Sequence, residues 1–162
     1  MKSYRIASIP GDGIGIEVIA AGVDILKALA EKEGFRLEFE HFDWSSKRYI
    51  EKGAYIPDGG LEKLKTFDAI FFGAVGSPDV PDHVSLWGLR LPICQGLDQY
   101  ANVRPSRVLP GVSSVLKGGD EIDWVIIREN SEGEYSGSGG RVHKGLPKEI
   151  ATETSVFTRV GV

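Results

Sequence analysis

The residues that could do chemistry in this chain gather in one short stretch, Arg128-Glu-Asn-Ser-Glu-Gly-Glu-Tyr135. The stretch follows an apolar run, Ile122–Ile127, whose pattern predicts a buried strand. A second arginine, Arg104, stands at the end of another strand-like run, in Asn102-Val103-Arg104-Pro105. Because guanidinium groups bind carboxylates through paired hydrogen bonds, two strand-end arginines and a tyrosine predict a site for a small polycarboxylate.

These residues also have ordinary structural interpretations. Arg104 and Arg128 could pair with nearby carboxylates such as Glu129 or Glu132, since most arginines in proteins form structural pairs. Tyr135 could be an aromatic core residue whose hydroxyl reaches water. The sequence alone therefore leaves a carboxylate site and structural ion pairs both open.

Two glycine-rich loops follow strand-like runs earlier in the chain. The first, residues 10–15, carries glycine at alternate positions, but the third glycine of the classical dinucleotide fingerprint would fall on Ile16. This loop could be a tight turn, or it could let a ligand approach the backbone at a helix N-terminus. The second loop, residues 73–78, favours a ligand, because parallel sheets bind ligands at the carboxyl ends of their strands.

Apolar patterning around these loops predicts an α/β fold. Strands and helices alternate over the first 78 residues, which indicates a mostly parallel sheet flanked by helices. The expected elements are strand 4–9, helix 16–34, strand 35–42, helices 45–52 and 58–65, and strand 69–72. Residues 79–97 contain Pro81 and Pro92, so we expect a loop with a short helix there.

The rest of the chain is expected to begin a second domain. Strands are predicted at 99–108, 122–127 and 148–153, and Ser136–Gly140 is predicted to be a turn or the base of a flexible hairpin. Thr154-Ser155 is typical of a helix N-cap followed by a first helical turn. Because a chain ending in that turn would leave an apolar face unburied, we expect these residues to be part of a longer protein.

Composition limits the classes of function. The chain has 162 residues, 41% of them hydrophobic and 26% charged, as in ordinary globular proteins. Its net charge of -4, without a basic stripe, disfavours binding to nucleic acid or an anionic membrane. No run is long enough to span a membrane, and Pro10 interrupts the first apolar run, so a cytoplasmic protein is predicted.

Metal and thiol chemistry find little support in the sequence. Cys94 is the only cysteine, which excludes an internal disulfide and a cysteine-rich zinc site. The three histidines are scattered without a second ligand at metal-binding spacing. We therefore predict no metal ligand within this chain.

In their order and spacing, the motifs resemble the β-decarboxylating dehydrogenases, which include isocitrate, isopropylmalate, tartrate and D-malate dehydrogenases. The resemblance rests on Ile9–Gly15, Gly73–Gly76, Asn102–Pro105 and Arg128–Tyr135. Residues 81–88 and 98–100 are similar to the tartrate and D-malate branch. The resemblance covers the whole chain, although family subunits are much longer.

The resemblance implies a fold and an activity. The fold would be isopropylmalate dehydrogenase-like, with the large cofactor-side domain beginning in residues 1–98 and a smaller α/β domain in residues 99–162. The activity would be oxidation of tartrate or D-malate by NAD with a divalent metal, Mg²⁺ or Mn²⁺, followed by decarboxylation. The metal ligands and the lysine of the proton relay would lie outside this chain, so the chain alone is expected to lack turnover.

The resemblance also implies roles for individual residues. Arg104 and Arg128 would bind the carboxylates of a small dicarboxylate substrate, and Tyr135 would protonate the enol left after carbon dioxide departs. The nicotinamide end of NAD would lie against Ile14, Gly73, Ala74, Val75 and Gly76. A homodimer is expected, joined by an arm that includes residues 137–155.

Two positions bear on the substrate. The family usually carries an arginine ten residues before Arg104, where this chain has Cys94. Arg90 could replace it, and the change favours a short C4 diacid. Trp87 is too large for a pocket that accepts an isopropyl group, which disfavours the alternative of an isopropylmalate dehydrogenase. A non-catalytic module that binds a carboxylate or nucleotide is the alternative from another functional class.

Overall fold

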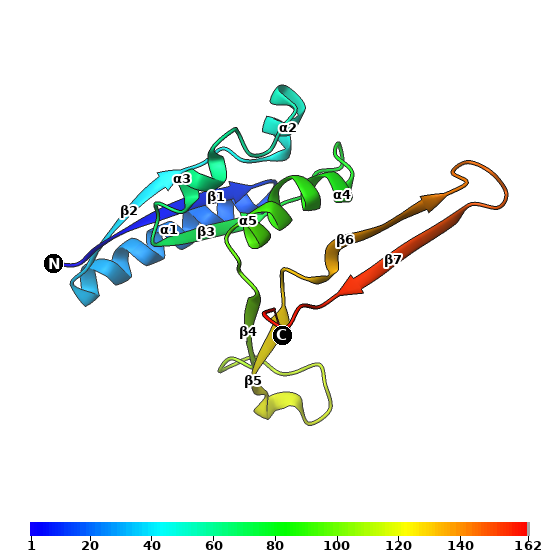
Figure 1. The fold of residues 1–162 in the computed structure, drawn as a ribbon. Helices are drawn as coiled ribbons and strands as arrows, with labels where there is room; N and C mark the ends of the chain where they lie inside the picture. The colour runs from blue at the N-terminus through cyan, green and yellow to red at the C-terminus, as the bar shows by residue number, and fades with distance from the viewer. Residues whose placement is uncertain (162) are drawn as a thin grey trace. The chain divides into compact units, whose positions relative to one another are not determined.

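The computed structural model describes residues 1–161, which form two compact units (Figure 1). Unit 1 is Met1–Leu97, and unit 2 begins at Asp98. The elements of unit 1 are β1 (Ser3–Gly11), α1 (Ile14–Glu33), β2 (Arg36–His41), α2 (Ser46–Lys52), α3 (Gly60–Leu64), β3 (Ala69–Ala74), α4 (Asp82–Ser85), the π-helical turn η1 (Leu86–Arg90) and α5 (Leu91–Gly96). Unit 2 contains β4 (Ala101–Arg107), the 3₁₀ turn η2 (Gly119–Glu121), β5 (Asp123–Glu129), β6 (Gly133–Val142) and β7 (Ile150–Val156).

Unit 1 is built on a three-stranded parallel sheet in the order β2-β1-β3. The central strand β1 is buried where Ala7 and Ile9 face the core. Helix α1 packs against β1 and β3, and α1 ends at Gly34, whose positive φ of 74° terminates the helix. A parallel sheet flanked by helices confirms the predicted α/β class.

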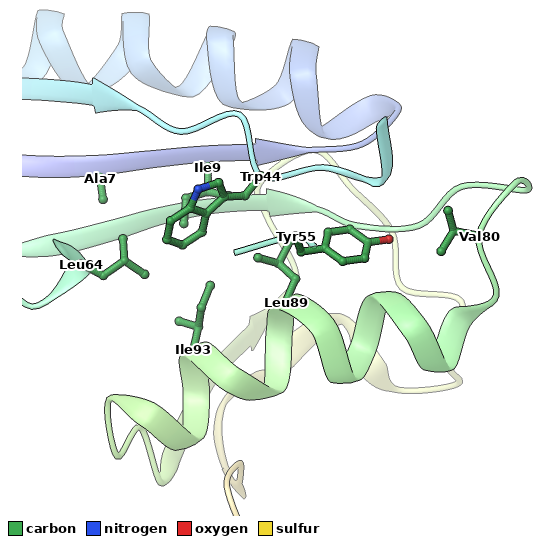
Figure 2. Packing of buried hydrophobic residues seen from close by; sticks show 8 residues of the cluster. All are labelled: Ala7, Ile9, Trp44, Tyr55, Leu64, Val80, Leu89 and Ile93. Carbon is green, nitrogen blue, oxygen red and sulfur yellow. The ribbon is translucent and has the colours of Figure 1, made fainter. Parts of the chain in front are cut away.

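The core of unit 1 lies between this sheet and the α4–α5 run (Figure 2). Trp44 and Tyr55 come from the segments around α2, whereas Leu89 and Ile93 come from the helical run. The cluster is Ala7, Ile9, Trp44, Tyr55, Leu64, Val80, Leu89 and Ile93. Burial of such large side chains contributes about 1.5–3 kcal/mol each, so this cluster is the main source of stability in unit 1.

The expectation that residues 79–97 form a loop with a short helix was wrong. Residues 82–96 are helical throughout, and Leu89 and Leu91 are fully buried. The two prolines are accommodated by position: Pro81 directly precedes α4, and Pro92 follows a π turn in which Leu91 N bonds to Leu86 O. A proline in a regular helix clashes with the carbonyl four residues earlier, and the wider turn relieves that clash.

Unit 2 consists of two antiparallel strand pairs, β4-β5 and β6-β7. A strand at the predicted position, β5, is present, but the prediction that it is buried was wrong for this chain. Four consecutive apolar residues of β5 are exposed by about half or more: Trp124 56%, Val125 64%, Ile126 48% and Ile127 63%. Within the described residues, the β4-β5 pair therefore has apolar side chains on both faces.

Two further predictions in unit 2 concern local structure. Residues Ser136–Gly140, predicted to be a turn or the base of a flexible hairpin, do not form a turn. They lie within β6 of the β6-β7 hairpin, where Gly139 permits a close approach to β7. A β-carbon there would collide with Thr152 O and lie 3.1 Å from Glu153 Cα. Thr154-Ser155 does not cap a helix, since β7 continues to Val156. The β-branched residues of β7 favour an extended strand, and β6 is present as the strand that pairs with it.

Gly15 offers a test of how unit 1 packs. A β-carbon at Gly15 would collide with Pro10 O and lie 2.6 Å from Ala74 N, whereas one at Gly34 would meet nothing within 4 Å. Gly15→Ala should therefore lower the free energy of unfolding by at least about 2 kcal/mol. Gly34→Ala should cost only about 1 kcal/mol, the strain of the left-handed backbone. Urea denaturation followed by circular dichroism measures both, and equal losses would contradict the packing argument.

Candidate functional site

The two glycine loops of unit 1 meet at the carboxyl edge of the parallel sheet. Asp12 N donates to Ala74 O at 2.7 Å, directly beyond the last β1-β3 pair, Gly11 and Ala74. Gly73 is required here because a β-carbon would collide with Pro10 O. Packing of one backbone on the other thus explains part of the glycine pattern without a ligand.

Asp12 joins three segments at this edge. Its carboxylate accepts hydrogen bonds from Ser46 N at 2.7 Å, Ser46 Oγ at 2.6 Å and Gly76 N at 3.0 Å. The bonded groups belong to the first residue of α2 and to the loop that follows β3. Sequence reasoning missed Asp12, although a carboxylate inside a glycine loop, close to many backbone N–H groups, was a usable signal.

A buried tyrosine extends this network. Tyr55 Oη lies 2.8 Å from Ser46 Oγ, and both residues are almost completely buried. Since the one hydroxyl proton of Ser46 goes to Asp12, Tyr55 is the donor in this contact. Burial, with a smaller contribution from the Asp12 charge, raises the pKa of Tyr55, so this hydroxyl keeps its proton.

A cleft of about 490 Å³ opens beside this network. Its lining includes Asp12, Gly13, Ser45, Lys47, Gly76 and Pro78. A β-carbon at Gly13 or Gly76 would meet nothing within 4 Å, so these two glycines border open space. The cleft is therefore suited to a ligand that approaches the backbone next to the N-terminus of α1.

The residues predicted to bind the cofactor do not all line this cleft. Gly76 lines the cleft, whereas Gly73 and Ala74 belong to the end of β3 and Val75 follows them. Ile14 is the first residue of α1 and is 64% exposed. The roles of all five at the nicotinamide remain predictions.

In unit 2, the two predicted substrate arginines lie on the same face of the β4-β5 pair. Arg128 is opposite Asn102, and Arg104 is opposite Ile126. Residues directly opposite each other, and residues two apart on one strand, point to the same face. Arg104 and Arg128 are therefore diagonal neighbours, a relation that typically separates residues by about 7–8 Å. Arg104 lies in the middle of β4, not at the strand end as expected.

Tyr135 is in direct contact with Arg128. Arg128 Nη2 donates to Tyr135 Oη at 2.8 Å, and the guanidinium carbon lies 5.5 Å from the centre of the tyrosine ring. This bond uses a lone pair of the phenol oxygen, not its proton. The geometry thus places a phenol hydroxyl next to a guanidinium group, and guanidinium groups can bind carboxylates.

The turn between Arg128 and Tyr135 is held by the carboxylate of Glu129. Its Oε1 accepts from Ser131 N at 2.6 Å and Glu132 N at 2.5 Å. Partial burial by itself would raise the pKa of Glu129, but hydrogen bonds from the backbone of Glu132, Ser131 and Asn130 outweigh burial and lower it. The carboxylate of Glu129 therefore stabilises the turn through bonds to its Oε1.

The alternative in which the arginines form structural ion pairs does not match these contacts. Glu129 is bonded to the turn, and Glu132 accepts from Thr158 N at 2.8 Å and Thr158 Oγ1 at 2.6 Å. Among the described residues, no ion pair within 4.0 Å joins Arg104 or Arg128 to a carboxylate. Both guanidinium groups therefore keep donors for an anionic ligand.

Other predicted features lie elsewhere. Arg90 is half-buried at the end of the π turn η1 in unit 1, and Cys94 is buried in α5. That Arg90 replaces the family arginine whose position Cys94 occupies stays a prediction. A hollow of about 510 Å³ beside Arg128 is lined by Tyr100 and Phe157, but not by Arg104 or Tyr135.

Metal and membrane features were searched over residues 1–161. That part of the chain contains no group of three or more His, Cys, Asp or Glu side chains placed to hold a metal ion. Among the same residues, no helix combines the length and the apolar character that crossing a bilayer requires.

Comparison with known proteins identifies the family. The sequence model of the isocitrate/isopropylmalate dehydrogenase family matches residues 5–162. The chain belongs to this family. Probable tartrate dehydrogenase/decarboxylase proteins of Agrobacterium vitis are 63–64% identical over 165 residues, and the D-malate dehydrogenase [decarboxylating] of Escherichia coli (strain K12) is 52% identical over 166 residues.

Solved structures agree with this assignment. The isocitrate dehydrogenase from Methylococcus capsulatus matches with a TM-score of 0.78 and 27% identity, covering 98% of this chain and 44% of that chain. The Agrobacterium vitis and Escherichia coli relatives are matched over 100% of this chain and about 46% of their own length. The chain thus spans less than half the length of these family members.

The lowered pKa of Glu129 predicts how the turn responds to acid. A depressed folded-state pKa stabilises the turn above the unfolded value of about 4.3, and that stability is lost as the pH falls through the folded value. Glu129→Gln should therefore remove an acid-induced change in the amide chemical shifts of Ser131 and Glu132. The shifts are measured by NMR between about pH 6 and about pH 2, a range of roughly two units on each side of the unfolded value. An unchanged transition in the variant would mean that another group causes it.

Proposed function

We propose that the protein carrying this chain is an NAD-dependent, decarboxylating dehydrogenase of tartrate or D-malate. The observation that carries the proposal is the grouping in unit 2, where Arg104 and Arg128 share one strand-pair face and Arg128 is bonded to Tyr135. The names of the Agrobacterium vitis and Escherichia coli relatives support the same reaction class. We further propose that this enzyme is located in the cytoplasm.

The substrate is a short 2-hydroxy dicarboxylate. Each guanidinium can bind a carboxylate through two parallel hydrogen bonds, and diagonal neighbours on one face suit the two ends of a C4 diacid. Arg90 would add a contact in place of the family arginine that Cys94 replaces.

Tyr135 is the proton donor of the decarboxylation. Oxidation at C2 gives a β-keto acid, which loses carbon dioxide and leaves an enol that must be protonated at carbon. We assign this proton to the hydroxyl of Tyr135, which lies beside the carboxylate-binding guanidinium of Arg128 at 2.8 Å.

Unit 1 is the cofactor side. The cleft bordered by Gly13 and Gly76 fits part of a dinucleotide, since no β-carbon blocks approach to the backbone there. NAD would accept the hydride from C2. The exposed apolar side chain of Ile14 and the loop from Gly73 to Gly76 would shield the nicotinamide from water.

A divalent cation, Mg²⁺ or Mn²⁺, would be bound by ligands outside this chain. The described residues do not fit it as a site, because no three potential ligands cluster among them. We also propose that the whole protein forms a homodimer, in which residues 137–155 are part of the arm that joins the two subunits. The β6-β7 hairpin supports an arm, since its exposed strands are well paired and its end is tied by Arg141 Nη1 to Glu149 Oε1 at 2.8 Å.

The test uses a chimera in which these 162 residues replace the matching 46% of an Agrobacterium vitis relative that is 64% identical. We call it the family chimera. Arg128→Lys keeps the charge but removes the paired hydrogen bonds, so kcat/KM for D-malate or tartrate should fall at least about 100-fold, equivalent to about 2.7 kcal/mol. NADH formation is followed by absorbance.

Arg107→Lys is the matched control, because Arg107 lies on the same strand as Arg104 but on the opposite face. This variant should keep kcat/KM within about twofold, as expected for an exposed side chain away from the site. An Arg128→Lys enzyme that is as active as the control would show that Arg128 has a structural role only.

The metal requirement has a separate test. Exhaustive chelation should abolish NADH formation by the family chimera, and added Mn²⁺ or Mg²⁺ should restore it. Steady turnover after chelation, with metal content verified by elemental analysis, would exclude the proposed metal dependence.

A further inference from the structure

Tyr135 lies in a part of β6 that regular strand pairing does not fix. The β6-β7 ladder is regular from Ser138 to Val142, but its register shifts between Gly133 and Ser138. Tyr135 falls within that shift, and its backbone N–H donates to Glu132 O at 3.2 Å. The placement of the Tyr135 side chain therefore depends on the residue that begins this turn, Glu132.

The carboxylate of Glu132 is bound by a single residue beyond β7. Oε2 accepts from Thr158 N at 2.8 Å, and Oε1 accepts from Thr158 Oγ1 at 2.6 Å. Gly161 N donates to the same hydroxyl at 3.1 Å, so Thr158 Oγ1 accepts one bond and donates another. We call the two bonds to Glu132 the Glu132–Thr158 clamp. Hydrogen bonds to a carboxylate are stronger than those between neutral groups, so the clamp ties the turn to a segment 26 residues later.

Packing next to the clamp is close. Gly133 is buried, has a positive φ of 66° and stands opposite Val156. A β-carbon at Gly133 would lie 3.2 Å from the ring of Phe157. The turn therefore lies against the segment that carries Thr158, which limits the positions that Glu132 can take.

We propose that Glu132 is a positioning residue for the proton donor of the reaction. Through the Glu132–Thr158 clamp it fixes the turn that holds the Tyr135 hydroxyl 2.8 Å from Arg128 Nη2. The inference rests on the proposed function, in which Tyr135 protonates the enol. Displacing a reacting group by about 1 Å can lower a rate about 100-fold, so a turn without the clamp should slow the proton transfer.

The substrate arginines are held in a different way. Arg104 and Arg128 belong to the β4-β5 pair, whose residues stay in register from Ala101 to Arg107. Loss of the clamp should therefore leave carboxylate binding in place and slow only the proton transfer. A residue that only stabilises the fold would not separate these two properties.

The test is made in the family chimera with Glu132→Ala, which removes both bonds to Thr158. We expect kcat for D-malate or tartrate to fall at least about tenfold, with KM for the acid within about twofold of the parent. Glu134→Ala is the matched control, because Glu134 is an exposed carboxylate two residues along the chain. The control should keep kcat and KM within about twofold. A Glu132→Ala enzyme indistinguishable from the control would overturn the proposal.

A double variant tests whether Glu132 acts through Tyr135. Tyr135→Phe should lower kcat by itself, and adding Glu132→Ala should then cost less than about twofold more, because the group that Glu132 positions is gone. A further loss of about tenfold in the double variant would show that Glu132 acts elsewhere and would overturn the proposal. Tyr135→Phe with the kcat of the parent would refute the proposed function itself. An impaired Tyr135→Phe beside an unimpaired Glu132→Ala would refute the positioning role alone.

A second pair of variants keeps the test decisive if Glu132→Ala does not fold. Thr158→Val removes one bond of the clamp at nearly constant size, and Thr158→Ser keeps it. Thr158→Val should lower kcat at least about threefold, as expected for one lost hydrogen bond to a charged group, whereas Thr158→Ser should stay within about twofold of the parent. Equal kcat values in the two Thr158 variants would contradict the clamp.

Discussion

The carboxylate of Asp12 is the interaction on which the organisation of unit 1 depends. It ties the loop after β1 to the first residue of α2 and to Gly76, and through Ser46 it reaches Tyr55 in the core. A partly buried carboxylate needs such donors, because an unpaired charge there would cost several kcal/mol. The bonds of Asp12 therefore fix the loops that border the cleft at the same time as they satisfy its own charge.

In unit 2, a second carboxylate, that of Glu129, is also stabilised by backbone N–H groups. Glu129 accepts from the backbone of the turn, which leaves the adjacent Arg128 to contact Tyr135. If Glu129 instead paired with Arg128, the guanidinium would be neutralised and less able to bind a substrate carboxylate. Because Glu129 bonds to the turn, the guanidinium of Arg128 keeps its positive charge on the β4-β5 face.

Much of unit 1 could be predicted from sequence, because helix and strand periodicity is a local property. The alternation of strands and helices up to β3 and the glycine loops followed directly from residue type and spacing. The α4–α5 run could not be predicted, since tolerance of Pro92 depends on a π turn that no local pattern announces. Asp12 was missed because its partners Ser46 and Gly76 lie 34 and 64 residues away.

In unit 2, sequence reasoning singled out residues that the structure places near one another, but it did not predict their surroundings. Arg104, Arg128 and Tyr135 were identified from their types and their place near strands, and their common location required only that β4 pair with β5. The prediction that β5 is buried was wrong for these residues. A continuous apolar run is typical of a covered strand, but the run does not identify the segment that covers it. The same reasoning applies to α1, where apolar residues remain exposed beside the packed row.

The central claim is that the two arginines and the tyrosine of unit 2 form a site for a 2-hydroxy dicarboxylate. The most direct measurement is a crystal structure of the family chimera with D-malate or tartrate bound. The account predicts that the substrate carboxylates contact the guanidinium groups of Arg104 and Arg128, with Tyr135 Oη within hydrogen-bond distance of the substrate. A substrate bound with both carboxylates away from these arginines would contradict it.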